Sequence, residues 1–348
     1  TLLGVVLPLD FFLTLAHLIL DLNMRLLAHL NHFPVAVWQQ HAPPPWTVLV
    51  AIIGLLWLFL PKGFPARWLG VAALLPVFMV VPASPATGAF WLTVLDVGQG
   101  LSAVVRTHQH TLLYDAGPSF GLEADSGTRV ILPYLRSAGI TRLSGMVISH
   151  SDNDHSGGAI SVLKAVPTAW LASSLPNNHE ILRHTKQALP CFAGQSWVWD
   201  EVRFEMLHPD KENYSEDWWK DNARSCVLKI STRAGSALLP GDIERDVEQR
   251  LIKNGAPLAS TLVVAPHHGS KTSSTQEFVS ATDPAAVIYA VGYRNRYRHP
   301  RPEVMERYRA AGSLAFRTDA DGAITVYFED QTKLATYRSQ YRRYWHDH

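Results

Sequence analysis

Two imidazoles and two carboxylates stand within six residues of one another at the end of a short apolar run. The run Met146–Ile148 predicts a buried strand, and it is followed by Ser149-His150-Ser151-Asp152-Asn153-Asp154-His155-Ser156-Gly157-Gly158. A helix is expected to begin at the two glycines. Side chains of this kind are good metal ligands and poor core residues. A helix cap needs one such residue rather than four, so the stretch predicts a metal site on a strand-to-helix turn.

Charged side chains are scarce at the start of the chain. The sequence has 348 residues, 47% hydrophobic and 18% charged, and its first 82 residues carry only Asp10, Asp21, Arg25, Lys62 and Arg67 as full charges. Between residues 2 and 30 the polar positions recur at helical intervals. This pattern predicts an amphipathic helix at a membrane surface or inside a helix bundle.

Two uncharged runs, Trp46–Leu60 and Trp68–Val81, follow a run of three prolines. Each is shorter than the roughly 20 residues that cross a bilayer core, but flanking prolines and interfacial tryptophans extend them. We predict two short transmembrane helices, with a buried helical hairpin of a soluble protein as the alternative. The positive charges of Lys62 and Arg67 place the loop between them in the cytoplasm and residue 83 onward on the outer side. Residues 1–82 are therefore expected to end a longer multi-pass region.

After a linker at residues 83–89, residues 90–335 predict a mixed α/β domain. Strands are expected at 91–95, 102–107, 111–114, 143–149, 168–172, 202–207, 226–232, 236–239, 261–265, 286–291, 314–317 and 323–328, and helices at 128–138, 158–165, 244–254 and 275–282. This order favours two packed sheets with helices outside. A basic-aromatic tail occupies residues 336–348. Cys191 and Cys226 allow either one disulfide or two buried thiols.

Two later strands also end in ligand-type residues. The pair Gly241-Asp242 closes one of them, and the pair His267-His268 closes another. Adjacent histidines after a buried strand are uncommon as core residues, so at least one is expected to be a ligand or a proton donor. His268 is the expected ligand, and His267 either holds it or serves the leaving group.

Basic and hydroxyl residues follow these ligands. Ser270 and Lys271 offer contacts to a phosphate oxygen, with a solvated turn as the alternative. The loop at residues 293–301 holds four arginines and two tyrosines. Guanidinium groups suit phosphates and tyrosine rings suit base stacking, while a solvated basic loop is the alternative. His299 in this loop is a candidate late metal ligand or general acid.

The spacing His-x-Asp-x-Asp-His at residues 150–155 resembles the first metal motif of the metallo-β-lactamase superfamily, usually written His-x-His-x-Asp-His. Asp152 stands at the position of the second histidine, and a carboxylate is a harder ligand that tilts the site from zinc toward manganese or magnesium. The resemblance implies an αββα sandwich and a two-metal site bridged by Asp242. The histidine of the third motif is missing. Asn222 stands near its place, where an amide oxygen can bind a hard cation or a water.

Five stretches, in order, resemble the C-terminal part of the ComEC family of DNA-uptake channels: residues 96–100, 149–158, 222–228, 241–242 and 267–274. The resemblance implies a metal-dependent nuclease on the periplasmic side of the inner membrane. Its substrate would be the DNA strand that does not enter through the single-stranded DNA channel. Implied partners are single- or double-stranded DNA, the membrane, and other competence proteins such as a DNA receptor and a helicase.

This interpretation assigns the candidate residues to three roles. The metal ligands, with Mn²⁺ favoured and Zn²⁺ or Mg²⁺ as alternatives, are His150, Asp152, Asp154, His155, Asp242 and His268. The catalytic residues are Asp154, His267 and His299. The DNA-binding residues are Asn222, Ser225, Ser270, Lys271, Arg294, Arg296 and Arg298. Two rival functions are a hydrolase of a lactone, thioester or small phosphodiester, and a degenerate domain that binds or gates DNA, which the missing third histidine motivates.

Overall fold

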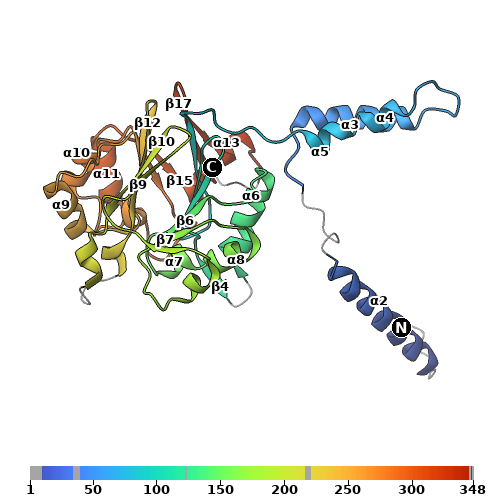
Figure 1. Cartoon of the computed structure of the whole chain (residues 1–348), viewed down its shortest axis with the longest axis horizontal. Coiled ribbons are helices and arrows are strands. Elements are labelled where there is room, and N and C mark those ends of the chain that lie inside the picture. The colour runs from blue at the N-terminus through green and yellow to red at the C-terminus, as the bar shows by residue number, and fades with distance from the viewer. Residues whose placement is uncertain (1–9, 34–39, 122–123, 216–220, 345, 347–348) are drawn as a thin grey trace. The chain divides into compact units, whose positions relative to one another are not determined.

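The computed structural model describes residues 10–33, 40–121, 124–215, 221–344 and 346, and the chain divides into two units at residues 1–41 and 42–348 (Figure 1). In the first unit, helix α2 (Asp10–Asn31) buries no side chain, and Arg25 and Asp21 form an ion pair at 2.8 Å one turn apart. Among the described helices, only α2 is long and apolar enough to cross a membrane. Residues 2–9 of the predicted helix, and residues 345 and 347–348 of the predicted tail, lie outside the described residues.

A short apolar hairpin opens the second unit. Helix α3 (Pro45–Leu58) confirms the first predicted helix, but the second is two short helices, α4 (Leu69–Ala72) and α5 (Leu75–Met79). The break has a local cause, because Pro76 has no N–H to donate to the carbonyl one turn earlier. Helices α3 and α4 approach closely at two glycines, since a Cβ on Gly54 would lie 2.7 Å from the Gly70 carbonyl oxygen. The membrane location of this hairpin stays a prediction.

Two sheets form the core of the second unit. The first has the order β17 (Thr332–Thr336), β16 (Ile324–Phe328), β1 (Phe90–Val94), β2 (Ala103–Arg106), β3 (Thr111–Tyr114), β6 (Gly145–Ile148), β7 (Leu171–Ser173) and β8 (Ala188–Pro190). The second has the order β15 (Leu314–Arg317), β14 (Ala286–Tyr289), β13 (Leu262–Val264), β12 (Gly235–Leu239), β11 (Val227–Thr232), β10 (Val202–His208) and β9 (Ser196–Trp199). In both sheets the strands that lead to the ligand-bearing turns, β6, β12 and β13, have parallel neighbours.

Alternating side chains divide the apolar residues between the two faces of each sheet. In β6, Val147 joins the core between the sheets, whereas Met146 and Ile148 pack under the outer helices. In β13, Leu262 and Val264 join the central core. Figure 1 places α6 and α8 outside the first sheet and α9, α10 and α11 outside the second. The α-helices that follow the hairpin are α6 (Leu132–Ser137), α7 (Asn153–Ser156), α8 (Ala159–Ala165), α9 (Arg245–Lys253), α10 (Gln276–Thr282), α11 (Pro302–Ala310), α12 (Thr318–Asp321) and α13 (Tyr337–Gln340). The predicted αββα sandwich is confirmed.

Several predicted elements need correction. The helix expected at 128–138 is a π-helical turn at Gly127–Ile131 followed by α6, and the strand expected at 168–172 begins only at Leu171. Strands β8, β9 and β17 and helix α11 were not predicted. β8 is an edge strand exposed at all three residues, and β9 alternates exposed and half-buried positions over only four residues, which is too short to show a period. The small hairpin of β4 (Ser119–Gly121) and β5 (Ala124–Asp125) was also missed.

Candidate metal centre

The turn that carries the ligands is fixed by backbone hydrogen bonds from two other loops. The N–H of Leu101 donates to the carbonyl of Asp154 at 3.0 Å, and the N–H of Ala116 donates to the carbonyl of His155 at 2.7 Å. A Cβ on Gly100 would collide with the Asp154 carbonyl oxygen, and the φ of this glycine is +142°. Only glycine therefore permits the close approach of this loop to the metal turn.

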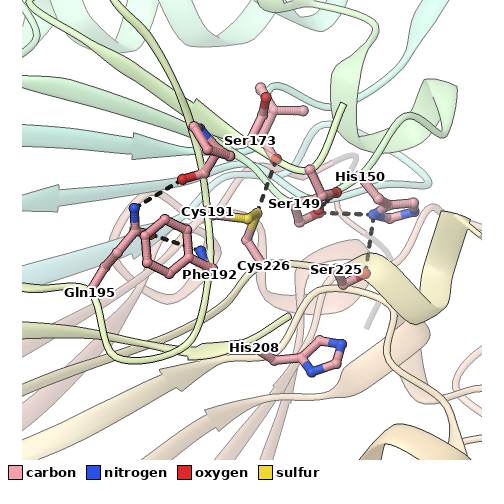
Figure 2. The surroundings of a disulfide bond; sticks show 12 residues. Ser149, His150, Ser173, Cys191, Phe192, Gln195, His208, Ser225 and Cys226 are labelled. Atoms are coloured by element: carbon pink, nitrogen blue, oxygen red, sulfur yellow. Dashed lines mark hydrogen bonds between the residues drawn. A yellow bond between two sulfur atoms is a disulfide. The ribbon is translucent and has the colours of Figure 1, made fainter. Parts of the chain in front are cut away.

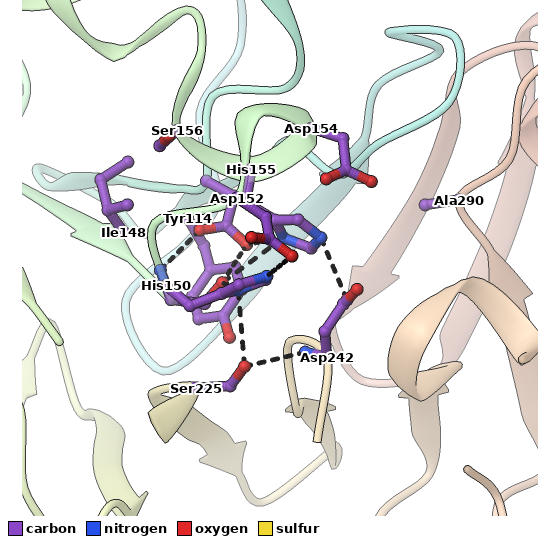
Figure 3. Close-up of polar contacts among 12 residues, drawn as sticks. Tyr114, Ile148, His150, Asp152, Asp154, His155, Ser156, Ser225, Asp242 and Ala290 are labelled. Carbon is purple, nitrogen blue, oxygen red and sulfur yellow. Dashed lines mark hydrogen bonds and ion pairs between the residues drawn. The ribbon is translucent and has the colours of Figure 1, made fainter. Parts of the chain in front are cut away.

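His155 lies at the centre of the site and is fully buried. Its Nδ1 atom lies 2.7 Å from Oδ2 of Asp115, which accepts the Nδ1 proton, so Nε2 is the nitrogen that faces the other ligands. That Nε2 lies 3.0 Å from Oδ1 of Asp242 and 3.1 Å from Nε2 of His268. Figure 3 shows the His155 ring between the carboxylates of Asp154 and Asp242.

His268 is oriented in the same way by a backbone acceptor. Its Nδ1 donates to the carbonyl of Ala290 at 2.8 Å, because a carbonyl can only accept. Its Nε2 lies 3.2 Å from Oδ2 of Asp154 and 3.5 Å from Oδ2 of Asp242. His267 and His268 both have left-handed backbones, with φ of 51° and 55°. Such conformations cost non-glycine residues about 1–3 kcal/mol each and concentrate at functional sites.

His150 occupies the opposite side of the site. Its Nδ1 lies 2.9 Å from Oγ of Ser149 and 3.4 Å from Oγ of Ser225, and Ser225 Oγ accepts from the N–H of Asp242 at 3.1 Å (Figure 3). Its Nε2 is buried and has no hydrogen-bond partner among the described residues. The carboxylate of Asp152 lies 3.5 Å from this Nε2 and is half-exposed. A buried nitrogen without a hydrogen bond calls for an explanation, and a cation bound between it and the nearby carboxylate supplies one.

The residues present fit a divalent cation. Two groups of potential ligands have atoms within 4.8 Å of one another, His150–His155–Asp242 and Asp154–His155–His268, and they share His155. The nitrogens of three imidazoles and the oxygens of two carboxylates converge there, and the carboxylates repel one another unless a positive charge stands among them. Imidazole nitrogens with carboxylate oxygens form a mixed donor set that suits Mn²⁺ as well as Zn²⁺.

The acidities of these groups reflect the same convergence. Burial raises the pKa of Asp154, but the hydrogen bond from His268 and the charges of the imidazoles outweigh it and hold the pKa at about 2. Burial also opposes ionisation of Asp242, yet His155 and His268 hold its pKa well below the usual range. The carboxylates beside His155 raise its pKa despite the cost of burying a charge. Protons on the imidazoles thus supply charge that a bound cation would supply instead.

His267 and His299 lie at the edge of the ligand groups. His267 Nε2 lies 3.7 Å from Oδ2 of Asp242, and its Nδ1 lies 3.3 Å from Oε1 of Glu244. The rings of His267 and His299 meet edge to face at 5.9 Å. Burial and the neighbouring histidines lower the pKa of His299 to about 4, so it is neutral at neutral pH. Neither residue belongs to the two ligand groups.

Apart from the arginines, the predicted DNA-binding residues lie in three places. Ser225 is buried against His150, as described above. Ser270 is buried, with its hydroxyl 3.0 Å from Oγ1 of Thr272, whereas Lys271 is exposed. Asn222 is half-buried on a 3₁₀ turn, Asp221–Arg224, which Ser151 ties to the metal turn by donating to Asp221 at 2.5 Å.

The three arginines do not share one surface. Arg296 lines a groove that also contains Asp152 and Asp154. Arg294 and Arg298 line a separate pocket of 430 Å³ with His299. The loop is held in shape by Asn295, whose side-chain amide donates to the carbonyl of His299 at 2.7 Å.

Cys191 and Cys226 form a disulfide directly behind the metal turn (Figure 2). Cys226 follows Ser225 in the chain, and its N–H donates to the carbonyl of Ser149 at 3.0 Å. The disulfide thus fixes two residues whose hydroxyl groups contact His150. His208, the neighbouring histidine in sequence, is buried with its Nε2 donating to the carbonyl of Ala223 at 2.8 Å, and it belongs to neither ligand group.

Sequence reasoning missed the residues that orient the ligands. Asp115 directly follows the buried strand β3, and an aspartate in that position was a usable signal. It also accepts from the backbone N–H of Ser149 at 2.6 Å and from the hydroxyl of Ser149 at 2.8 Å. Carboxylates that accept from a metal-bound histidine fix its tautomer and ring orientation. The Ala290 carbonyl had no side-chain signal at all.

Two sheets, outer helices and this ligand set define a metallo-β-lactamase fold. The chain belongs to the metallo-β-lactamase superfamily, whose family model matches residues 95–293. Members of this superfamily are mostly metal-dependent hydrolases.

Curated relatives narrow the family further. Competence protein ComA of Neisseria gonorrhoeae is 37% identical over 81% of this chain and 38% of its own length. The protein YcaI of Escherichia coli is 32% identical over 89% of this chain and 39% of its own length, and Recombination protein 2 of Haemophilus influenzae is 33% identical over 71% and 30%. The resemblance to the ComEC family is confirmed. The chain spans less than two fifths of the length of each of these relatives.

Proposed function

We propose that this chain hydrolyses phosphodiester bonds of DNA during uptake, acting on the strand that is not transported. The observation that carries the proposal is the pair of ligand groups sharing His155, at the edge of a groove that also contains Arg296. The names of two relatives, a competence protein and a recombination protein, support a role in DNA uptake. The missing third-motif histidine is compatible with this role, because Asp152 and Asn222 offer oxygen ligands for a hard cation.

The proposed ligands are His150, Asp152, Asp154, His155, Asp242 and His268, with Mn²⁺ favoured. When bound, a divalent cation supplies Lewis acidity toward the scissile phosphate and lowers the pKa of a coordinated water. Asp154 and Asp242 hold their charge at neutral pH. Asp154 is therefore proposed to orient the attacking water.

His267 is the better candidate for protonating the leaving oxygen. It is partly exposed, and Glu244 and Asp242 flank its two nitrogens, as a shuttling imidazole requires. His299 is proposed to act as a neutral hydrogen-bonding group, because its low pKa leaves it without a proton to give at neutral pH. Lys271, Ser270 and the arginines of the 293–301 loop are proposed to contact the DNA backbone.

We further propose that the domain works at the outer face of an inner membrane, with a DNA receptor and a helicase as functional partners. The apolar helices α2 and α3 support membrane attachment. The Cys191–Cys226 disulfide supports an oxidising compartment, because disulfides persist outside the cytosol and are rare within it. The orientation inferred from Lys62 and Arg67 agrees with this placement.

The test is cleavage of labelled DNA by the purified chain with Mn²⁺, compared with hydrolysis of a lactone, a thioester and a small phosphodiester. Asp242→Asn should abolish DNA cleavage, while His208→Gln, which changes a buried histidine outside the ligand groups, should retain it. Preferential hydrolysis of a small substrate would favour the rival hydrolase. DNA binding without any cleavage at full metal loading would favour the DNA-binding or gating role.

A further inference from the structure

A groove of about 580 Å³ opens beside the ligand turn. Its lining includes Asp152, Asp154 and Arg296, together with the aromatic rings of Phe120 and Tyr297. The groove therefore brings carboxylates of the candidate metal site, a positive charge and two aromatic rings onto one surface. Phe120 lies in the small β4–β5 hairpin, which no sequence motif had marked for function.

Both aromatic rings are more exposed to solvent than rings that pack in the core of the domain. Phe120 is 54% exposed and Tyr297 is 47% exposed, whereas Tyr114 of β3 and Tyr289 of β14 are completely buried. Each ring also carries an arginine. The guanidinium carbon of Arg129 lies 5.7 Å from the Phe120 ring centroid, and that of Arg296 lies 4.8 Å from the Tyr297 centroid. The side chain of Arg296 also donates to the hydroxyl of Tyr297 at 2.6 Å.

We propose that this groove binds single-stranded DNA, with bases stacked on Phe120 and Tyr297 and phosphates beside Arg129 and Arg296. Every base has a π-face, so stacking on exposed rings gives affinity without sequence preference. In a duplex those faces are covered by neighbouring base pairs. The rings therefore select unpaired strands, and the arginines direct the backbone toward the turn that holds Asp152 and Asp154.

Charge makes this binding depend on a divalent ion. Asp152 and Asp154 face the same groove and repel phosphates unless a cation neutralises them. Binding of single strands should therefore strengthen when Ca²⁺, which also takes carboxylate ligands, is added in place of a metal that supports hydrolysis. The inference rests on the proposed nuclease function in one respect: cleavage of the bound strand depends on that function, whereas binding of the strand does not.

The experiment is fluorescence anisotropy of a labelled single-stranded oligonucleotide and of its duplex, with the purified full chain in Ca²⁺. We expect Phe120→Ala and Tyr297→Ala each to weaken single-strand binding about 5-fold to 100-fold, and to change duplex binding little. The ring-preserving variants Phe120→Trp and Tyr297→Phe should restore binding. Tyr341→Ala, which removes a ring of 54% exposure outside the groove, serves as the matched control.

The two proposals fail in different ways. Unchanged single-strand binding in both alanine variants, or an equal loss in the Tyr341→Ala control, would overturn the stacking site and leave the nuclease proposal standing. Weakened single-strand binding in a chain that cleaves no DNA would uphold the stacking site and remove the nuclease.

Discussion

The Nδ1 atom of His155 lies 2.7 Å from Oδ2 of Asp115, and both side chains are fully buried. The carboxylate holds a proton on Nδ1 of His155, so Nε2 is the nitrogen that faces Asp242 and His268 and that a metal would bind. Because Asp115 also accepts two hydrogen bonds from Ser149, it ties the end of β3 to the end of β6. The centre therefore depends on a residue that would never contact the metal.

Replacing Asp115 should weaken the metal centre without unfolding the domain. Loss of such an orienting carboxylate typically costs 10-fold to 100-fold in metal affinity, and we expect about that loss for Asp115→Asn in a Mn²⁺ titration followed by electron paramagnetic resonance. Asp200→Asn is the control, because Asp200 accepts from Thr107 and Gln109 away from the ligands. An unchanged Mn²⁺ affinity in Asp115→Asn would show that Asp115 does not orient a ligand.

His155 belongs to both ligand groups, whereas His150 belongs to one. We therefore expect His155→Ala to remove more bound metal than His150→Ala, because only the first substitution breaks both groups. Metal content after dialysis, measured by plasma mass spectrometry, compares the two variants directly. Equal losses of bound metal from the two variants would mean that the two ligand groups do not bind metal independently.

The strands that lead to the ligands could be predicted from sequence, because they are buried on both faces. Both Met146–Ile148 and Leu262–Val264 are uninterrupted apolar runs, and a histidine of the candidate site follows each of them within three residues. The edge strands could not be found in this way. Residues 188–190 are all exposed, and their pairing with β7 comes from the tertiary arrangement rather than from their own pattern.

The orienting contacts were similarly beyond the sequence. Ala290 contributes only a carbonyl, which every residue possesses, and its closeness to His268 follows from the parallel pairing of β13 with β14. Phe120 looked like a loop residue because its two-strand hairpin is too short to show a period. Side-chain type predicted the ligands, and only the fold could identify what surrounds them.

Buried His208 should make the domain less stable in mild acid. Burial lowers its pKa to about 4, whereas the unfolded chain has the ordinary value near 6.5. Above pH 6.5 the imidazole is neutral in both states and contributes no pH dependence. As the pH falls from 6.5 to 4, the unfolded chain takes up the proton first, so stability falls by up to about 3 kcal/mol.

The measurement for His208 is urea unfolding followed by tryptophan fluorescence at several pH values. The difference in unfolding free energy between the parent and His208→Gln should shrink by that amount between pH 7 and pH 4. Glutamine retains a donor for the Ala223 carbonyl and does not titrate, so it isolates the effect of protonation. Parallel pH profiles of the unfolding free energy for the parent and His208→Gln would exclude His208 as the source of the loss of stability in acid.

Removing the disulfide should lower both stability and metal affinity. The two cysteines are 35 residues apart, and a crosslink of that span is worth about 3–4 kcal/mol by the chain-entropy model. Cys191→Ser should therefore lower the free energy of unfolding, and it should weaken metal binding at the His150 side because Ser225 and Ser149 lose their support. Thermal unfolding and metal titration of the oxidised, reduced and Cys191→Ser forms test both effects. Identical metal affinity in all three forms would show that the disulfide does not support the metal site.

The position of Cys226 next to Ser225 also has a cellular consequence. A chain still in the cytosol, where thiols stay reduced, would lack the brace behind the His150 half of its ligand set. Under the proposed function, its capacity to cut DNA would mature only after export. The chromosome of the producing cell would then be spared from a nuclease made in the same compartment, and formation of the disulfide would activate the enzyme.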